Sequence, residues 1–173
     1  MKRPAAFGLA FPGLCLAMIL NGQPADTSGH TSVGRIAPDF SAMTLEGRSF
    51  TLSEMKGRPV VINFFAIWCP SCRMELPELQ KTVWEPFRNA GLEVLAVGRE
   101  HTAAELDTFR VRHGFTFDFA PDPDRSIFRL YADKFIPRTL LVGRDGRIVF
   151  QTLGYKPGDM DTLALRVADA LKP

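Results

Sequence analysis

The sequence predicts one α/β domain in which a central mixed β-sheet is flanked by helices. Short apolar, β-branched runs alternate with helical segments along the chain, which is the pattern of strands joined by crossover helices. Two late strands are joined by an Asp-Gly turn, which adds an antiparallel edge to the sheet. Hydrophobic residues make up 46% of the 173 residues, which is enough for one core of ordinary size.

The first 21 residues have the layout of an export signal. Met1-Lys2-Arg3 is basic, and residues 5–20 are apolar and uncharged. We therefore expect residues 1–21 to be a signal peptide or an N-terminal membrane anchor, and the domain to be periplasmic or otherwise extracytoplasmic. No Ala-x-Ala cleavage site follows, so cleavage and anchoring both stay open. Leu14 before Cys15 argues against a lipoprotein, which would have a small residue at that position.

A tether and a hairpin are predicted next. Residues 22–35 are small and polar and predict a flexible tether, so that the domain occupies residues 36–173. Residues 36–45 and 49–52 predict an N-terminal β-hairpin. One helical turn is expected after it, at residues 53–56.

A buried strand and a long helix follow. The apolar run at residues 59–66 predicts a strand that is buried on both faces. Residues 69–89 predict a helix, and Pro77 should kink it because proline removes an internal hydrogen bond. Residues 92–97 predict a second buried strand.

The second half of the chain carries clear boundary signals. Thr102 and Glu105 have the spacing of a capping box, and Asp124 is placed to cap another helix. The elements predicted from these and similar signals are a helix at 103–113, a strand at 115–119, a helix at 124–131, a β-hairpin formed by 139–142 and 147–153, and an amphipathic helix at 159–171.

Net charge gives no reason to expect a nucleic acid partner. The formal charge is +2, and Lys2 and Arg3 in the export segment account for all of it, so the rest of the chain is neutral.

Cysteine and histidine usage argues against a metal site. Beyond Cys15 the chain has two cysteines, which are too few for a disulfide scaffold or, alone, for a four-ligand zinc site. The three histidines are scattered along the sequence: His30, His101 and His113. We therefore expect no metal and no other cofactor, and a redox function for the remaining two cysteines.

The run Cys69-Pro70-Ser71-Cys72 follows a predicted buried strand and opens a predicted helix. Unpaired N–H groups and the helix dipole stabilise a thiolate at a helix N-terminus. We therefore expect Cys69 to be the attacking thiol and Cys72 the resolving one. Half of a metal site or a structural staple is the alternative.

Two segments resemble the signatures of thioredoxin-like proteins. Residues 63–72 (Asn-Phe-Phe-Ala-Ile-Trp-Cys-Pro-Ser-Cys) are similar to the strand-to-helix signature, and residues 135–142 (Phe-Ile-Pro-Arg-Thr-Leu-Leu-Val) to the second one. The resemblance covers residues 36–171 and implies a thioredoxin fold. It also implies that Pro137 is cis and lies against the disulfide, where Ile136 can pair with an extended substrate. A trans turn proline is the alternative.

The segment from Cys72 to Pro77 resembles the Cys-x-x-Glu-x-Pro pattern of the TlpA/ResA group of exported thiol–disulfide oxidoreductases. The helix and strand at residues 103–119 are similar to that group's insertion in the fold, and Ala37-Pro38-Asp39-Phe40 is similar to the start of such redoxin (AhpC/TSA-like) domains. The resemblance implies a reductant of protein disulfides that receives electrons from a membrane donor. Some members of this group keep apocytochrome c cysteines reduced for haem attachment.

The same resemblance implies a role for Glu75 close to the disulfide. We expect a partly buried carboxyl group whose raised pKa lets it exchange protons with Cys72, because both burial and a neighbouring thiolate disfavour the carboxylate. An ordinary solvated glutamate is the alternative.

The remaining site residues are assigned to substrate contact. Trp68, directly before Cys69, is expected to shield the site and meet the substrate, with a core position as the alternative. Pro70, directly after Cys69, is also expected to contact the substrate. The same is expected of Ile136 and Pro137. Arg138 departs from the small or polar residue common at its position and is either an exposed charge beside the site or a surface arginine without a role.

Two other functions stay open. A peroxiredoxin generally has Thr or Ser three residues before its reactive cysteine, and this chain has Ala66 there. A copper metallochaperone would need a third ligand beside the two thiolates, for which His101 is the one candidate.

Overall fold

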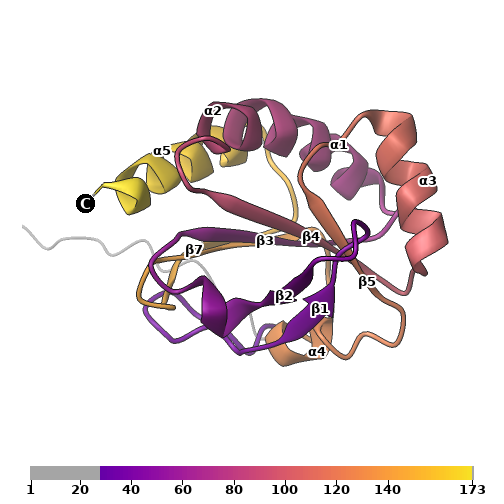
Figure 1. Ribbon diagram of the computed structural model, residues 1–173, viewed down its shortest axis with the longest axis horizontal. Coiled ribbons are helices and arrows are strands. Elements are labelled where there is room, and N and C mark those ends of the chain that lie inside the picture. Colours follow the sequence, from indigo (N-terminus) through magenta and orange to yellow (C-terminus); the bar gives the residue numbers. More distant parts are fainter. Residues whose placement is uncertain (1–27, 173) are drawn as a thin grey trace, which may run out of the picture.

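The computed structural model of the protein describes residues 28–172, so the predicted signal or anchor and residues 22–27 of the tether lie outside the described part. A five-stranded mixed sheet forms the centre, in the order β5-β4-β3-β6-β7 (Figure 1). Its strands are β3 (Val60–Phe65), β4 (Glu93–Arg99), β5 (Asp118–Asp122), β6 (Arg138–Val142) and β7 (Ile148–Leu153). The mixed sheet and its flanking helices confirm the predicted thioredoxin fold.

Strand β3 is the middle of the sheet and is buried along its whole length. It runs parallel to β4 and antiparallel to β6, so Asn63 lies opposite Ala96 on one side and opposite Thr139 on the other. Strand β4 continues in parallel to β5, and β6 continues in an antiparallel pair to β7. The predicted crossover and hairpin connections are therefore both present.

Helices cover one face of the sheet, as Figure 1 shows: α1 (Pro70–Glu78), α2 (Glu85–Phe87), α3 (Ala103–His113) and α5 (Asp159–Leu171). The hairpin of β1 (Ser41–Met43) and β2 (Ser49–Thr51), the short helix η1 (Leu52–Met55) and α4 (Phe128–Tyr131) cover the other face. Alternate residues of β3 supply the two cores, because side chains alternate across a strand. Phe65 packs into the core under α1, and Phe64 packs into the core under the hairpin. Among residues 28–172, no helix is long and apolar enough to cross a membrane.

The predicted helix at residues 69–89 forms three consecutive segments. Helix α1 continues into a wider, π-type turn, η2 (Leu79–Trp84), and then into α2. Pro77 lies inside α1 and has no N–H to donate to the preceding turn. The change of hydrogen-bonding pattern begins two residues after this proline, close to the predicted kink.

The predicted start of the strand at residues 115–119 is wrong: β5 begins at Asp118, three residues later. Phe115 belongs to the end of α3 instead, where its N–H donates to the carbonyl of Arg110 after Gly114 has turned the chain with φ 68°. The strand then extends through Pro121, which an edge strand tolerates.

The predicted cap of α4 is also wrong. Asp124 accepts the N–H of Ser126, in a local turn before the helix. The carboxylate of Asp122 accepts the N–H groups of Ile127 and Phe128 instead, at 3.0 and 2.8 Å. The helix therefore begins at Phe128, later than the sequence predicted.

Residues 28–35, which we predicted to belong to the flexible tether, lie against the domain. The N–H of His30 donates to the carbonyl of Tyr131, and that of Gly34 donates to the carbonyl of Ile148, each at 2.8 Å. The domain surface that surrounds α4 and β7 is therefore partly covered by this segment.

Candidate active site

The two cysteines lie where β3 ends and α1 begins. Cys69 is the N-cap of α1, and its Sγ accepts the N–H of Cys72 at 3.2 Å. The cysteines form a disulfide with a Cα–Cα distance of 5.3 Å. Cys69 retains 4% of its exposure, whereas Cys72 is completely buried. Of the two cysteines, only Cys69 therefore retains any exposure.

The loop before β6 brings a second segment to the disulfide. The Ile136–Pro137 peptide bond is cis, which confirms the prediction of this geometry. The carbonyl oxygen of Ile136 lies 3.9 Å from Sγ of Cys69. The carbonyl of Pro137 accepts the N–H of Gly154, so the loop after β7 lies beside the same segment.

Trp68 and Pro70 are exposed on either side of Cys69. Trp68 is 59% exposed, so the alternative of a core position is wrong. The guanidinium of Arg99 lies 5.7 Å from the centre of the Trp68 ring and pairs with the carboxylate of Glu100 at 2.8 Å. A cation against one face of an indole ring stabilises its position, so Trp68 is exposed but supported.

Glu75 is completely buried, one turn after Cys72 on α1. Its carboxylate accepts Nδ2 of Asn63 at 2.7 Å and Oγ1 of Thr139 at 3.0 Å. The Asn63 amide also donates to the Thr139 hydroxyl at 2.8 Å, which closes a three-residue network across β3 and β6. The alternative of a solvated glutamate is therefore wrong.

Burial raises the pKa of Glu75 from 4.5 to about 7. The hydrogen bonds from Thr139 and Asn63 act against this rise, and the charges of Asp159 and Glu78 add to it. The observed network, in which both carboxylate oxygens accept, suits the ionised form. When Glu75 is protonated, its O–H must donate a hydrogen bond. The Thr139 hydroxyl permits this, because it can accept from Glu75 instead of donating to it.

Two polar residues in buried strands indicate this network already in the sequence. Asn63 is the single polar residue of the buried strand β3, and Thr139 is a polar residue in the buried strand β6. A buried polar side chain needs a hydrogen-bonding partner, so two such residues on neighbouring strands indicate a polar site between them.

His101 supports the segment that leads to the cysteines. Its Nε2 accepts the N–H of Ile67 at 2.9 Å, and the residue is 7% exposed. Burial lowers its pKa, while the charges of Glu105 and Glu100 act in the opposite direction. Because Nε2 already accepts this bond, the geometry does not favour His101 as a third copper ligand. Within residues 28–172, no group of three or more His, Cys, Asp or Glu side chains is placed to hold a metal ion.

Arg138 is buried, so both of our expectations of an exposed arginine are wrong. Its residue exposure is 1%, and its guanidinium donates to Oγ of Ser28 at 3.1 Å. Ser28 is 110 positions away in the sequence, and local pattern therefore gave no indication of this contact.

A groove of about 530 Å³ lies beside the redox segment. It is lined by Ile67, Trp68, His101, Ala104, Glu105, Thr108, Phe109 and Arg112. Its walls are the segment before Cys69 and helix α3, so it adjoins the exposed face of Trp68.

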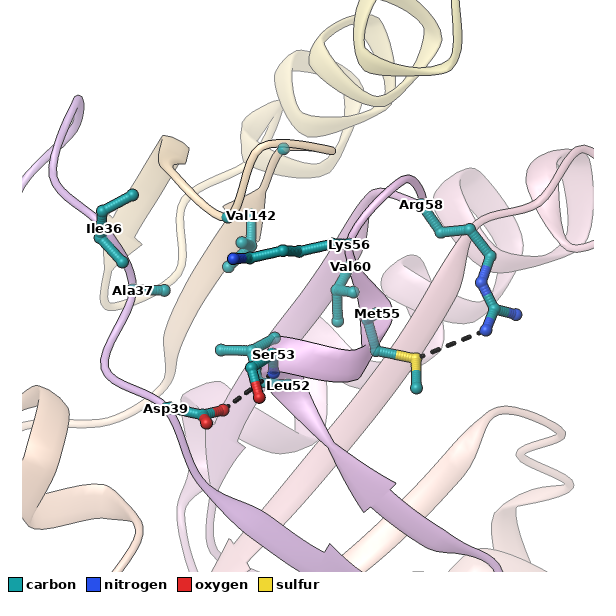
Figure 2. Close-up of a pocket in the computed structure, with 12 residues that line it drawn as sticks. Ile36, Ala37, Asp39, Leu52, Ser53, Met55, Lys56, Arg58, Val60 and Val142 are labelled. Carbon is teal, nitrogen blue, oxygen red and sulfur yellow. Dashed lines mark hydrogen bonds between the residues drawn. The ribbon is translucent and has the colours of Figure 1, made fainter.

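A second pocket, of about 120 Å³, lies near the start of β3, at the opposite end of this strand from Cys69 (Figure 2). Asp39 on its wall accepts the N–H of Ser53 at 2.8 Å, and Arg58 donates to the sulfur of Met55 (Figure 2). These contacts join the N-terminal segments to one another, and the pocket takes no part in the cysteine site.

Comparisons with known proteins agree with this geometry. The model of the AhpC/TSA family matches residues 33–151. Thiol-disulfide oxidoreductase ResA of Bacillus thuringiensis (strain Al Hakam) is 30% identical over 122 residues, which are 70% of each chain. The ResA protein of Geobacillus thermodenitrificans is 31% identical over 117 residues, which cover 68% of this chain and 67% of that one.

Solved structures give the same result. A candidate protein disulfide isomerase from Bacteroides thetaiotaomicron superposes with a TM-score of 0.80 at 31% identity, covering 84% of this chain and 94% of that one. A candidate thiol:disulfide interchange protein DsbE from Chlorobium tepidum superposes with a TM-score of 0.74 at 29% identity, covering 82% and 99%. With the Cys69–Cys72 pair in place, the chain belongs to the AhpC/TSA family, and within it to the thiol–disulfide oxidoreductases of thioredoxin fold.

Proposed function

We propose that the protein reduces disulfides of other proteins outside the cytoplasm, with Cys69 as the attacking thiolate. The observation that carries this proposal is the asymmetry of the pair. Sγ of Cys69 is at the helix N-terminus and accepts a backbone N–H, and Cys69 retains 4% exposure, whereas Cys72 is completely buried. A hydrogen bond donated to sulfur favours the thiolate, which is the nucleophile of disulfide exchange.

The reaction proceeds in two exchanges. The Cys69 thiolate attacks one sulfur of the substrate disulfide, forms a mixed disulfide and releases the other substrate sulfur as a thiolate, which takes up a proton. The thiolate of Cys72 then attacks Sγ of Cys69 and releases the second substrate thiol. Two electrons pass to the substrate, and the protein ends with the Cys69–Cys72 disulfide.

Glu75 supplies the proton exchange that the second step needs. Cys72 must lose its thiol proton before it can attack, and it has no contact with water in this fold. Glu75 follows it by one turn, is enclosed with it, and has a pKa of about 7. A group with a pKa near neutrality both accepts and returns a proton efficiently.

Trp68, Pro70, Ile136 and Pro137 form the substrate-contacting rim in this proposal. The two prolines and Ile136 lie on the segments that flank Cys69, and Trp68 is the large exposed side chain beside it. An extended substrate segment would lie across this rim with its cysteine at Sγ of Cys69.

The extracytoplasmic location has two supports. One is the basic and then apolar N-terminal segment. The other is a similar solved structure, described as a secreted Mycobacterium tuberculosis disulfide oxidoreductase homologous to E. coli DsbE, with a TM-score of 0.62 at 25% identity over 75% of this chain and 95% of that one. Substrates in an oxidising compartment accumulate disulfides, which gives a reductase its task there.

Regeneration requires an external dithiol. We propose a membrane-bound donor that reduces the Cys69–Cys72 disulfide, with the N-terminal segment acting as a signal or an anchor near it. As a substrate class we propose the paired cysteines of apocytochrome c, on the strength of the resemblance to the TlpA/ResA group.

The proposal is tested with the reduced protein and a peptide that carries an intramolecular Cys-x-x-Cys-His disulfide. We expect stoichiometric reduction of the peptide, with one protein disulfide formed for each peptide disulfide lost. Rapid turnover of hydrogen peroxide, with no reduction of the peptide, would contradict the proposal and indicate a thiol peroxidase.

A further inference from the structure

Phe135 has a backbone conformation and an exposure that packing does not explain. Its φ angle is 62°, in a region that bulky side chains rarely adopt and glycine adopts freely. Its side chain is 61% exposed, and within the described residues it belongs to neither core cluster. A conformation of this kind is strained for a bulky residue and is concentrated at functional sites. The fold would gain from glycine here, so the aromatic ring needs a functional reason.

Phe135 belongs to the loop that approaches the reacting sulfur. It precedes Ile136, whose carbonyl oxygen is 3.9 Å from Sγ of Cys69. A mixed disulfide holds the Cα atom of the substrate cysteine about 4.4–6.8 Å from that of Cys69. The next substrate residue lies only about 3.8 Å further along the chain. The exchange reaction itself therefore brings a residue that flanks the substrate cysteine close to the loop that carries Phe135.

We infer that Phe135 is a specificity-determining residue, which binds an apolar side chain adjacent to the substrate cysteine. The inference rests on the proposed exchange through Cys69 and adds the kind of sequence that this exchange prefers. An exposed aromatic ring gains most from contact with an apolar or aromatic partner, because the contact removes apolar surface of both from water. Trp68, 59% exposed on the segment before Cys69, offers a second aromatic surface to the same substrate segment.

The test uses two peptides, each with one cysteine held as a mixed disulfide with 5-thio-2-nitrobenzoate. Leucine flanks the cysteine in one peptide and serine in the other. The reduced protein attacks the peptide sulfur through Cys69 and releases the coloured thiolate, and Cys72 then frees the peptide thiol. We expect the wild-type protein to react at least about fivefold faster with the leucine peptide, in the second-order rate constant for release of the coloured thiolate, as a contact of this kind supports.

Three variants separate selection from folding. Phe135→Gly should bring the ratio of the two rates close to one, and it should unfold at the same or a higher urea concentration, because glycine adopts this φ without strain. Phe135→Tyr should retain the preference, because it keeps the ring. Leu165→Ala removes a side chain that is 69% exposed on α5 and should keep the wild-type ratio.

The outcomes distinguish this inference from the proposed function. Equal wild-type rates with the two peptides, or a preference that survives in Phe135→Gly, would overturn the inference and leave exchange through Cys69 standing. If the wild-type protein releases the coloured thiolate from neither peptide, the proposed function fails and the inference fails with it.

Discussion

Glu75 combines two opposing influences on a single carboxyl group. Its burial disfavours the charge, while the hydrogen bonds from Asn63 and Thr139 stabilise it. The balance leaves the pKa at about 7, so a small change in the surroundings changes its protonation state. A group of this kind is suited to moving a proton and contributes little to stability at neutral pH.

The first prediction concerns the pH dependence of stability in the disulfide form. The folded pKa of Glu75, about 7, is above the ordinary value of 4.5, so the folded state holds the proton more tightly than the unfolded state does. Its contribution is therefore fully present below about pH 4.5 and is lost as the pH rises through about 7, by roughly 3 kcal/mol in total. We expect Glu75→Gln to remove this decline in a series of urea titrations between pH 4.5 and 8.

Glu54→Gln is the matched control, because Glu54 is exposed on η1 and its loss should preserve the decline. Equal slopes for the wild-type protein and Glu75→Gln would show that the buried carboxyl group does not titrate in this range. In the exchange reaction, Glu75→Gln should slow reduction mainly near neutral pH, since the amide cannot exchange the proton.

The second prediction concerns the roles of the two cysteines. Cys72→Ser should accumulate a mixed disulfide between Cys69 and the substrate, because no thiolate remains to resolve it. Cys69→Ser should give neither reduction nor a trapped complex, because Cys72 is enclosed. Mass spectrometry of the trapped complex checks the assignment, and capture of the substrate through Cys72 would reverse the roles.

How much of the site was predictable depended on whether a residue's role is local. The cysteines, Glu75 and the cis bond before Pro137 belong to short motifs, and the structure has the disulfide, the buried carboxyl group and the cis bond that these motifs imply. The burial of Arg138 depends on Ser28, far away in sequence, and that of His101 depends on its packing beside Ile67. Contacts of this kind cannot be predicted from local pattern.

At the scale of elements, α3 is fixed in place by its caps and by one close approach to the sheet. Thr102 and Glu105 form the predicted capping box, and Gly114 ends the helix in a left-handed conformation. Gly98 on β4 faces Leu106 of α3, and a Cβ atom at Gly98 would overlap the Leu106 side chain. The small residue therefore sets how closely the helix packs, and with it the position of the groove beside Trp68.

The third prediction tests this close approach. Gly98→Ala should lower the free energy of unfolding by about 1–3 kcal/mol, because Leu106 is completely buried and has little room to move. In combination with Leu106→Ala, the added methyl group should cost less than it does alone, since the space has been vacated. Additive effects in urea denaturation of the two single variants and the double variant would contradict the proposed overlap.

The element boundaries show where local pattern was sufficient and where it was not. Helices α3 and α5 have the predicted bounds, because caps and periodicity are local signals. Strand β5 begins three residues late, because the cap of α3 takes up Phe115 and the edge of the sheet accepts Pro121. The competing interactions lie outside the predicted strand, so its alternating pattern could not reveal them.

At the scale of the whole molecule, the sheet order assembles the site. Strand β6 is a direct, antiparallel neighbour of β3, so the end of β3 lies beside the start of β6. The cysteines after β3 and the Ile136–Pro137 segment before β6 therefore meet at the same end of the sheet. The same pairing places Asn63 opposite Thr139, which creates the polar site for Glu75. Local pattern predicted that a mixed sheet forms, but the choice of neighbours came only with the resemblance to a known fold.

The direction of electron flow is a property of the whole molecule, because it depends on the relative stabilities of the dithiol and disulfide forms. The protein can reduce substrates only if its disulfide form is favoured over theirs. The central claim, that the protein is a reductase, therefore rests on one equilibrium quantity.

The measurement that tests this claim most directly is the reduction potential of the Cys69–Cys72 pair. The domain is equilibrated with glutathione buffers, and the fluorescence of Trp68, next to Cys69, follows the redox state, with Trp68→Phe as the control that identifies the signal. We predict a potential on the order of −200 mV or lower, in the range of thioredoxin-like reductants. A value near about −120 mV, where strong protein oxidants lie, would contradict the reductase account.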